Sequence, residues 1–251
     1  MASLLQNFRK MISSEAISVA KDVLEMSLDK VLENETLKEI PFFGWVISFY
    51  KIGTSIRERH TIKKVAAFLN ALHDISEEEK QAFESRLKDE DKKEELFETI
   101  LITLDRLDDT LKAEMVGNLF LMYIKHAIKK HEFLRFSNIV SKAFVGDLIN
   151  LHLTYSGLFA GDGVIDERFK EWRDYNRAEF EQNLFSLGLM QQTIGQKASN
   201  AAEANGIRGV TEPFIKTDIN SLGRSLATFL FYDLNDPYVN EYIEMIKEEN
   251  T

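Results

Sequence analysis

Proline is scarce in this chain, and this scarcity restricts the possible folds more than any other feature of the sequence. Only three of the 251 residues are proline, and glycine is modest at 12. Proline interrupts helices, whereas sandwiches and barrels need frequent turn residues between short strands. The alternation of strands and helices that a parallel sheet requires is not visible either. The sequence therefore predicts an all-α, mostly helical protein.

Apolar residues recur at steps of three and four along most of the chain, which is the spacing of amphipathic helices. Two helix starts carry local capping signals. Ser76 precedes Glu79 in a capping-box pattern, and residues 108–110 (Asp-Asp-Thr) end one apolar stripe before the next begins. From the stripes we expect continuous helices over residues 3–32, 61–72, 76–88, 111–130 and 133–152.

Composition excludes several classes of protein. A chain of 251 residues can form one large domain or two small ones, and 44% hydrophobic with 29% charged residues is typical of a globular protein. The absence of cysteine rules out disulfides, thiolate nucleophiles and cysteine-bound metals. We expect a cytoplasmic protein, because no secretory signal pattern is present at the N-terminus. The net charge of −10 argues against broad nucleic-acid binding.

The sequence contains no recognisable catalytic or cofactor-binding constellation. Its five histidines include no pair spaced i, i+4, and there is no His-Glu-x-x-His, P-loop or Gly-x-Ser-x-Gly pattern. Clustered acids stand at helix starts and on polar faces, where helix electrostatics explain them. We therefore predict no enzymatic activity, no cofactor and no metal site.

Residues 40–50 are the most hydrophobic stretch, and basic residues follow them closely. Eleven uncharged residues are too few to span a bilayer as a helix, for which about 17 are needed. An apolar, aromatic segment beside a basic one is typical of an interfacial membrane helix, and equally of a buried helix with a solvated continuation. The candidate interaction residues here are Phe42, Phe43, Trp45, Phe49, Tyr50, Arg57, Arg59, Lys63 and Lys64.

Residues 61–151 resemble TerB-like helical domains of bacteria, which are associated with stress and tellurite-resistance modules. The similarity lies in Ile75-Ser-Glu-Glu-Glu-Lys80, in the Asp105-x-x-Asp108 turn before a long helix, and in Glu132-Phe133 opening the next. TerB proteins usually carry an acidic Asp-Gly turn implicated in metal binding. Here that position has Lys-Lys-His-Glu (129–132), so the resemblance implies no metal site.

Residues 177–231 resemble the second half of a winged-helix domain. A helical pattern runs into Leu187-Gly-Leu-Met190, a polar stretch follows, and Thr217-Asp-x-x-x-Leu-Gly-Arg224 opens another helix. The resemblance implies a first helix at 137–152, a hairpin wing at 191–219 and nucleic-acid or partner contacts at Arg177, Lys197 and Arg208. We therefore expect three segments: N-terminal helices (1–60), a helical domain (61–136) and a winged-helix-like domain with a C-terminal helix (137–251).

Three functions fit these observations. The first is a non-catalytic, bacterial regulatory protein that binds a protein partner or self-associates through the apolar faces of residues 4–32 and 42–50. The second is a stress or phage-defence effector that associates peripherally with an anionic inner-membrane surface through residues 40–64. The third is a winged-helix DNA-binding regulator, which the acidic C-terminal half disfavours, because residues 137–251 carry ten basic and 17 acidic residues.

Overall fold

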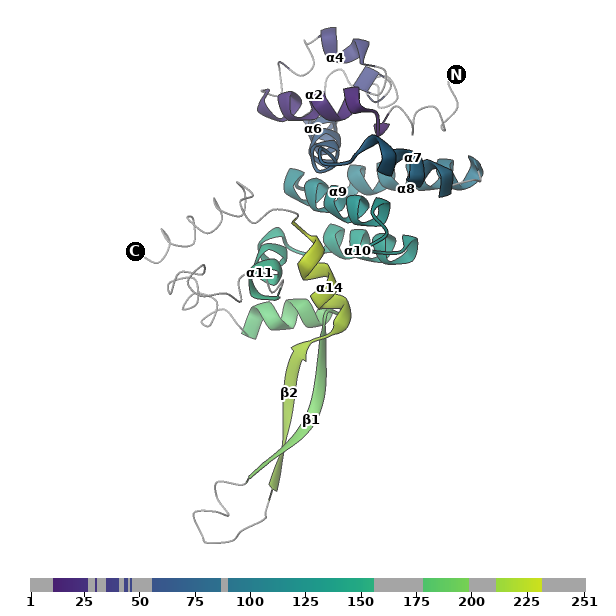
Figure 1. The fold of residues 1–251 in the computed structure, drawn as a ribbon. Coiled ribbons are helices and arrows are strands. Elements are labelled where there is room, and N and C mark those ends of the chain that lie inside the picture. Colours follow the sequence, from purple (N-terminus) through teal and green to yellow (C-terminus); the bar gives the residue numbers. More distant parts are fainter. Residues whose placement is uncertain are drawn as a thin grey trace. The chain divides into compact units, whose positions relative to one another are not determined.

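The structure, a computed structural model, describes residues 11–26, 30, 35–40, 43–44, 46, 56–86, 90–155, 178–198 and 211–231 (Figure 1). Helices dominate these ranges, and the sheet within them is a single antiparallel pair of strands. The predicted all-α class with one small β-hairpin is confirmed.

The chain forms two compact units. Unit 1 comprises residues 1–148 and 229–241, and unit 2 comprises residues 149–228 and 242–251. The described helices of unit 1 are α2 (Ser14–Glu25), α4 (Glu35–Glu39), α6 (Ile56–Asn70), α7 (Glu77–Arg86), α8 (Glu90–Arg106), α9 (Thr110–Ile124) and α10 (Lys130–Lys142). Two further helices, α11 (Val145–Tyr155) and α14 (Ser221–Phe229), carry residues of both units. The division into three segments stays a prediction.

Helix α9 is the centre of unit 1, because 12 of its 15 residues are buried. It packs on α6, which in turn packs on α2. At the crossing with α6, a Cβ on Gly117 would lie 2.5 Å from the Phe68 carbonyl oxygen, so only glycine permits this approach. Aromatic rings fill the space beside it, with centroids 5.3–6.2 Å apart among Phe68, Phe83, Phe120, Tyr123 and Phe133.

The capping signals of the sequence are confirmed. The Ser76 hydroxyl accepts a hydrogen bond from the Glu79 amide at 3.1 Å, and the Glu79 carboxylate accepts one from the Ser76 amide at 2.9 Å. Asp109 begins α9 by accepting a hydrogen bond from the Leu111 amide at 2.7 Å. Both motifs satisfy amides that the first helical turn leaves without partners.

Three predicted helices are shorter than expected. The helix predicted at 111–130 ends at Ile124, and His126 just beyond it adopts φ +64°. Residues 3–32 are not one helix, because Ser13 is extended (φ −68°, ψ 147°) and its hydroxyl caps α2, while Met26 is extended at the other end. The helix predicted at 133–152 is also wrong, since Ala143 (φ −72°, ψ 153°) separates α10 from α11. The first helix that the winged-helix resemblance implies is therefore broken. The Ser13 side chain bonds to the backbone and starts a new helix at this position. The spacing of apolar residues alone does not reveal such a break.

In unit 2, a helix over residues 178–186 leads into a two-stranded ribbon. Gly188 adopts φ +73° after that helix, and the Leu189 amide donates to the Leu184 carbonyl at 3.0 Å, closing the helix end. Strand β1 (Met190–Ala198) then pairs with β2 (Thr211–Ile219), and α14 follows directly. The hairpin thus lies where a wing is expected, and its two strands are nine residues long each.

Candidate functional site

Three of the candidate residues between 40 and 64 have described side chains, and all three make contacts within unit 1. Phe43 is fully buried, so its ring is not available to a membrane or partner. The Lys63 ammonium donates to the Leu24 carbonyl at 3.0 Å, at the C-terminal end of α2. The Lys64 ammonium is buried and donates to the carbonyls of Asp105 (3.0 Å) and Leu107 (2.8 Å). These contacts leave neither Phe43 nor Lys64 on a docking surface.

The side chains of the remaining candidates of this stretch lie outside the described part of the chain. Arg57 and Arg59 belong to α6, for which the backbone is described at these positions. Outside the described residues lie Phe42, Trp45, Phe49 and Tyr50.

The apolar stripe of α2 also lies inside unit 1. Ala16, Ala20 and Val23 are fully buried, and α2 packs against α6. The sequence had offered this stripe as a partner-binding face, but in the described segment its apolar side is covered by the chain itself.

The predicted nucleic-acid contacts do not form a described basic surface. Arg177 and Arg208 lie outside the described residues, and Lys197 stands opposite Glu212 in the β1–β2 register. The backbone register thus pairs this lysine with an acidic residue, which does not favour phosphate binding.

The described ranges lack a membrane-spanning helix and a metal-binding cluster. No helix in them is both long enough and apolar enough to cross a membrane. They also contain no group of three or more histidine and acidic side chains positioned to hold a metal ion.

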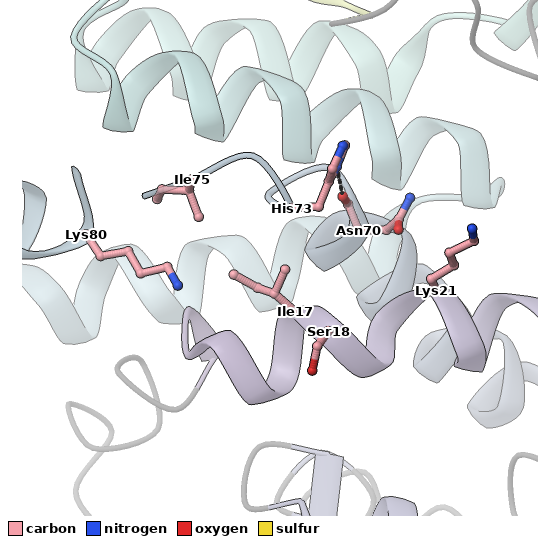
Figure 2. A pocket seen from close by; sticks show the side chains of 7 residues that line it. All are labelled: Ile17, Ser18, Lys21, Asn70, His73, Ile75 and Lys80. Carbon is pink, nitrogen blue, oxygen red and sulfur yellow. Dashed lines mark hydrogen bonds between the residues drawn. The ribbon is translucent and has the colours of Figure 1, made fainter. Parts of the chain in front are cut away.

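A cavity of about 510 Å³ lies between α2 and the segment joining α6 to α7 (Figure 2). Its size suits a small ligand. Figure 2 shows Lys21 and Lys80 at opposite ends, with Ile17 between them. The Lys80 ammonium contacts the Glu77 carboxylate at 2.7 Å, and the His73 ring contacts the Asn70 carbonyl at 2.7 Å. These two polar side chains of the cavity therefore bond to neighbouring residues and do not converge on a common point.

A second cavity, of about 540 Å³, is lined by His60, Lys64 and the turn at residues 105–110. Beside it, the Lys112 ammonium lies 2.7 Å from the Asp108 carboxylate. This hydrogen bond lowers the pKa of Asp108 below its ordinary value, and burial opposes it only in part. Together with the two carbonyl contacts of Lys64, the ion pair holds the turn between α8 and α9, which is a structural role.

The ribbon of unit 2 presents the most unusual surface among the described residues. Side chains alternate between the faces of a strand, so the register assigns each residue to one face. One face, here called the uncharged face, carries ten residues without a charge: Met190, Gln192, Ile194, Gln196, Ala198, Thr211, Pro213, Ile215, Thr217 and Ile219. Ile194 pairs with Ile215 across the strands, and these residues are 81% and 67% exposed.

The opposite face of the ribbon differs in chemistry. Lys216 and Asp218 form an ion pair there at 3.1 Å, and this hydrogen bond lowers the pKa of the Asp218 carboxyl. The ring of Phe214 covers Gly195, since a Cβ on that glycine would lie 2.6 Å from the ring. An aromatic ring over a cross-strand glycine buries part of its own apolar area. Within the described strands of the ribbon, the large exposed apolar side chains without such cover are therefore Ile194 and Ile215 of the uncharged face.

The base of the ribbon is fixed by Asn220. Its side-chain amide donates to the Gly188 carbonyl at 2.8 Å, and its side-chain oxygen accepts from the Gly223 amide at 2.9 Å, capping α14. Its backbone amide donates to the Leu189 carbonyl at 3.0 Å. Near this base Met190 and Ile219 are buried, whereas the residues farther along β1 and β2 run away from the helices of the unit (Figure 1). The ribbon is thus held rigidly at one end and exposed beyond it.

No protein-family model matches this sequence, and neither a curated protein nor a solved structure matches it significantly. The functional conclusion accordingly depends on the chemistry of the described surfaces.

Sequence reasoning identified the hairpin but missed its uncharged face. Alternate residues of Gln192-Thr-Ile-Gly-Gln196 and of Pro213-Phe-Ile-Lys-Thr217 carry the signal, because each series is free of charge. Reading it requires the strand register, which the sequence alone did not provide.

Proposed function

We propose that this chain is a non-catalytic interaction protein whose docking surface is the uncharged face of the β1–β2 ribbon. The observation that carries the proposal is the Ile194–Ile215 pair, directly opposed across the strands and largely exposed. Adjacent exposed apolar side chains rimmed by polar residues are a feature of surfaces that bind other proteins. The partner is a protein, either another molecule or a second copy of this chain.

The limited stability of an isolated ribbon supports the same function. A two-stranded hairpin is marginal in water unless a third strand or another element covers one face. Among the described elements of unit 2, only the ends near Met190 and Ile219 are covered. A bound protein would supply the missing cover and bury the two isoleucines.

Membrane and nucleic-acid binding have less support from this surface. Gln192 and Gln196 would lose their hydrogen bonds in hydrocarbon, which costs about 4–8 kcal/mol for each amide. A nucleic acid requires lysine and arginine to displace its counterions, and this face has neither. A protein partner can bond the amides and bury the isoleucines together.

Site-specific photo-crosslinking in the native host cells tests the proposal. A photoreactive residue is placed at Ile194, and at Thr193 as the matched control, because Thr193 is the adjacent exposed residue on the other face. We expect protein adducts at position 194 that are several-fold more abundant than those at position 193. Equal yields at the two positions, or no adduct with any protein, would contradict the proposed function.

A further inference from the structure

The uncharged face is chemically suited to bind a copy of itself. The whole protein carries a net charge of −10, so two copies repel each other through most surfaces. The ten residues of the uncharged face contribute nothing to that repulsion. Bringing two such faces together also buries no ion, which avoids the desolvation cost that a charged surface would incur.

Its hydrogen-bonding groups are also self-complementary. Gln192, Gln196 and Thr217 lie on this face, and each side chain has both donors and acceptors. A face containing such groups can satisfy an identical face, whereas a row of carboxylates or ammonium groups cannot. The paired isoleucines between them provide the apolar centre that protein interfaces require.

The register places the apolar pair at the midpoint of the ribbon. Ile194 and Ile215 are the fifth of nine paired positions between Met190–Ile219 and Ala198–Thr211. Symmetric dimers form around a two-fold axis, where a residue near the axis meets its own counterpart. An axis through the ribbon's centre would therefore stack the isoleucine pair of one copy on that of the other.

We propose that two copies of this chain associate face to face through their ribbons, with Ile194 and Ile215 of each copy at the two-fold axis. This inference rests on the proposed function and names its partner. A nine-residue ribbon is about 30 Å long and roughly 10 Å wide, so each copy covers only about 300 Å². Stable interfaces bury about 800 Å² on each partner, so we expect the dimer to be weak and reversible.

Sedimentation velocity on the full chain, from about 5 to 300 µM, tests the dimer. For the native protein we expect the sedimentation coefficient to rise with concentration by roughly 1.4-fold, as monomer converts to dimer. Ile194→Lys and Ile194→Glu should each abolish the rise, because like charges would meet at the axis. Thr193→Lys, on the other face, should retain it.

Mixing the two variants tests whether position 194 of one copy faces position 194 of the other. In an equimolar mixture of Ile194→Lys and Ile194→Glu, opposite charges face each other, and we expect dimer to return. Since Ile194 is 81% exposed, neither substitution should unfold the protein, and far-UV circular dichroism checks this. Dimer that both variants abolish but their mixture does not restore would overturn the face-to-face arrangement.

Failure of this inference can be told apart from failure of the proposed function. If the native protein stays monomeric over the whole range, self-association is wrong. Adducts between position 194 and a different protein would then leave the interaction function standing. If neither dimer nor selective adduct forms, both proposals fall.

Discussion

Gly223 of α14 lies against the backbone of Leu189, so closely that a Cβ on the glycine would be 2.4 Å from the Leu189 carbonyl oxygen. The same carbonyl accepts the Asn220 amide at 3.0 Å. The start of α14 and the start of the ribbon are therefore locked together, and the hairpin departs from the helices at a fixed place.

Replacing Gly223 with alanine should destabilise unit 2. The added methyl group must displace backbone atoms, which costs about 2 kcal/mol and exceeds the gain in helix propensity. Urea denaturation followed by circular dichroism measures the change. Arg224→Ala, at the neighbouring exposed position, should leave the midpoint almost unchanged. An unaltered midpoint for Gly223→Ala would show that the close approach is absent in solution.

Replacing Lys64 with methionine should destabilise unit 1 more than replacing Lys63 with methionine. Lys64 is buried and donates to two carbonyls at the end of α8, whereas half-buried Lys63 donates to one. A buried carbonyl left without its donor costs about 1–3 kcal/mol. We expect a loss of about 2–4 kcal/mol for Lys64→Met and about 1 kcal/mol for Lys63→Met in denaturant titrations. Equal losses would contradict the buried carbonyl contacts.

Asp108 should contribute stability that disappears in acid. The hydrogen bond from Lys112 lowers the pKa of Asp108 in the folded state, so the folded protein favours the carboxylate more than the unfolded chain does. The contribution is therefore complete above the unfolded pKa of about 3.9 and is lost as the pH falls through the lower folded value. Lys112 is buried but the Asp108 carboxylate is largely exposed to solvent, which screens the ion pair and limits its contribution to about 1 kcal/mol at most.

Comparing unfolding free energies from pH 7 to pH 2 tests this expectation. Asp108→Asn should be less stable than the native protein at pH 7, and the difference should vanish near pH 2. Glu98→Gln removes a negative charge from an exposed position of α8 and serves as the control. A constant difference across the pH range would exclude the ionised carboxylate as its cause.

Arg86 should not be replaceable by lysine. One guanidinium nitrogen donates to the Ile124 carbonyl at 2.7 Å, another contacts His126 at 2.5 Å, and the group lies 5.2 Å from the Phe83 ring centroid. Lysine keeps the charge but lacks the planar fork that makes these contacts together. We expect Arg86→Lys to lower the unfolding free energy by about 1–2 kcal/mol.

Thermal unfolding of the Arg86→Lys variant tests this expectation, and Arg135→Lys serves as the matched control. Arg135 is exposed on α10, so its replacement should change the midpoint by less than about 1 °C. Equal effects of the two substitutions would show that the contacts of Arg86 at the end of α9 do not stabilise unit 1.

Features that depend on neighbours within a few residues could be predicted. The Ser76–Glu79 capping box and the Asp109 cap were both found in the sequence, because each hydrogen bond spans three residues or fewer. The all-α class followed from the scarcity of proline, and the position of the hairpin from the order of its polar and extended segments. None of these features depends on which helices and strands pack against each other.

Features that depend on distant parts of the chain were decided by the tertiary structure. Phe43 looked like an interaction residue, but it is buried, and Lys64 bonds to carbonyls 41 and 43 residues away. An apolar stripe has the same sequence pattern whether its own chain or a partner covers it. The uncharged ribbon face likewise exists only in one strand register, since a shift of β2 by one residue would bring Lys216 and Asp218 onto it. The sequence alone determined the helical class, the local caps and the place of the hairpin, whereas packing decided which faces of these elements remain exposed to bind something else.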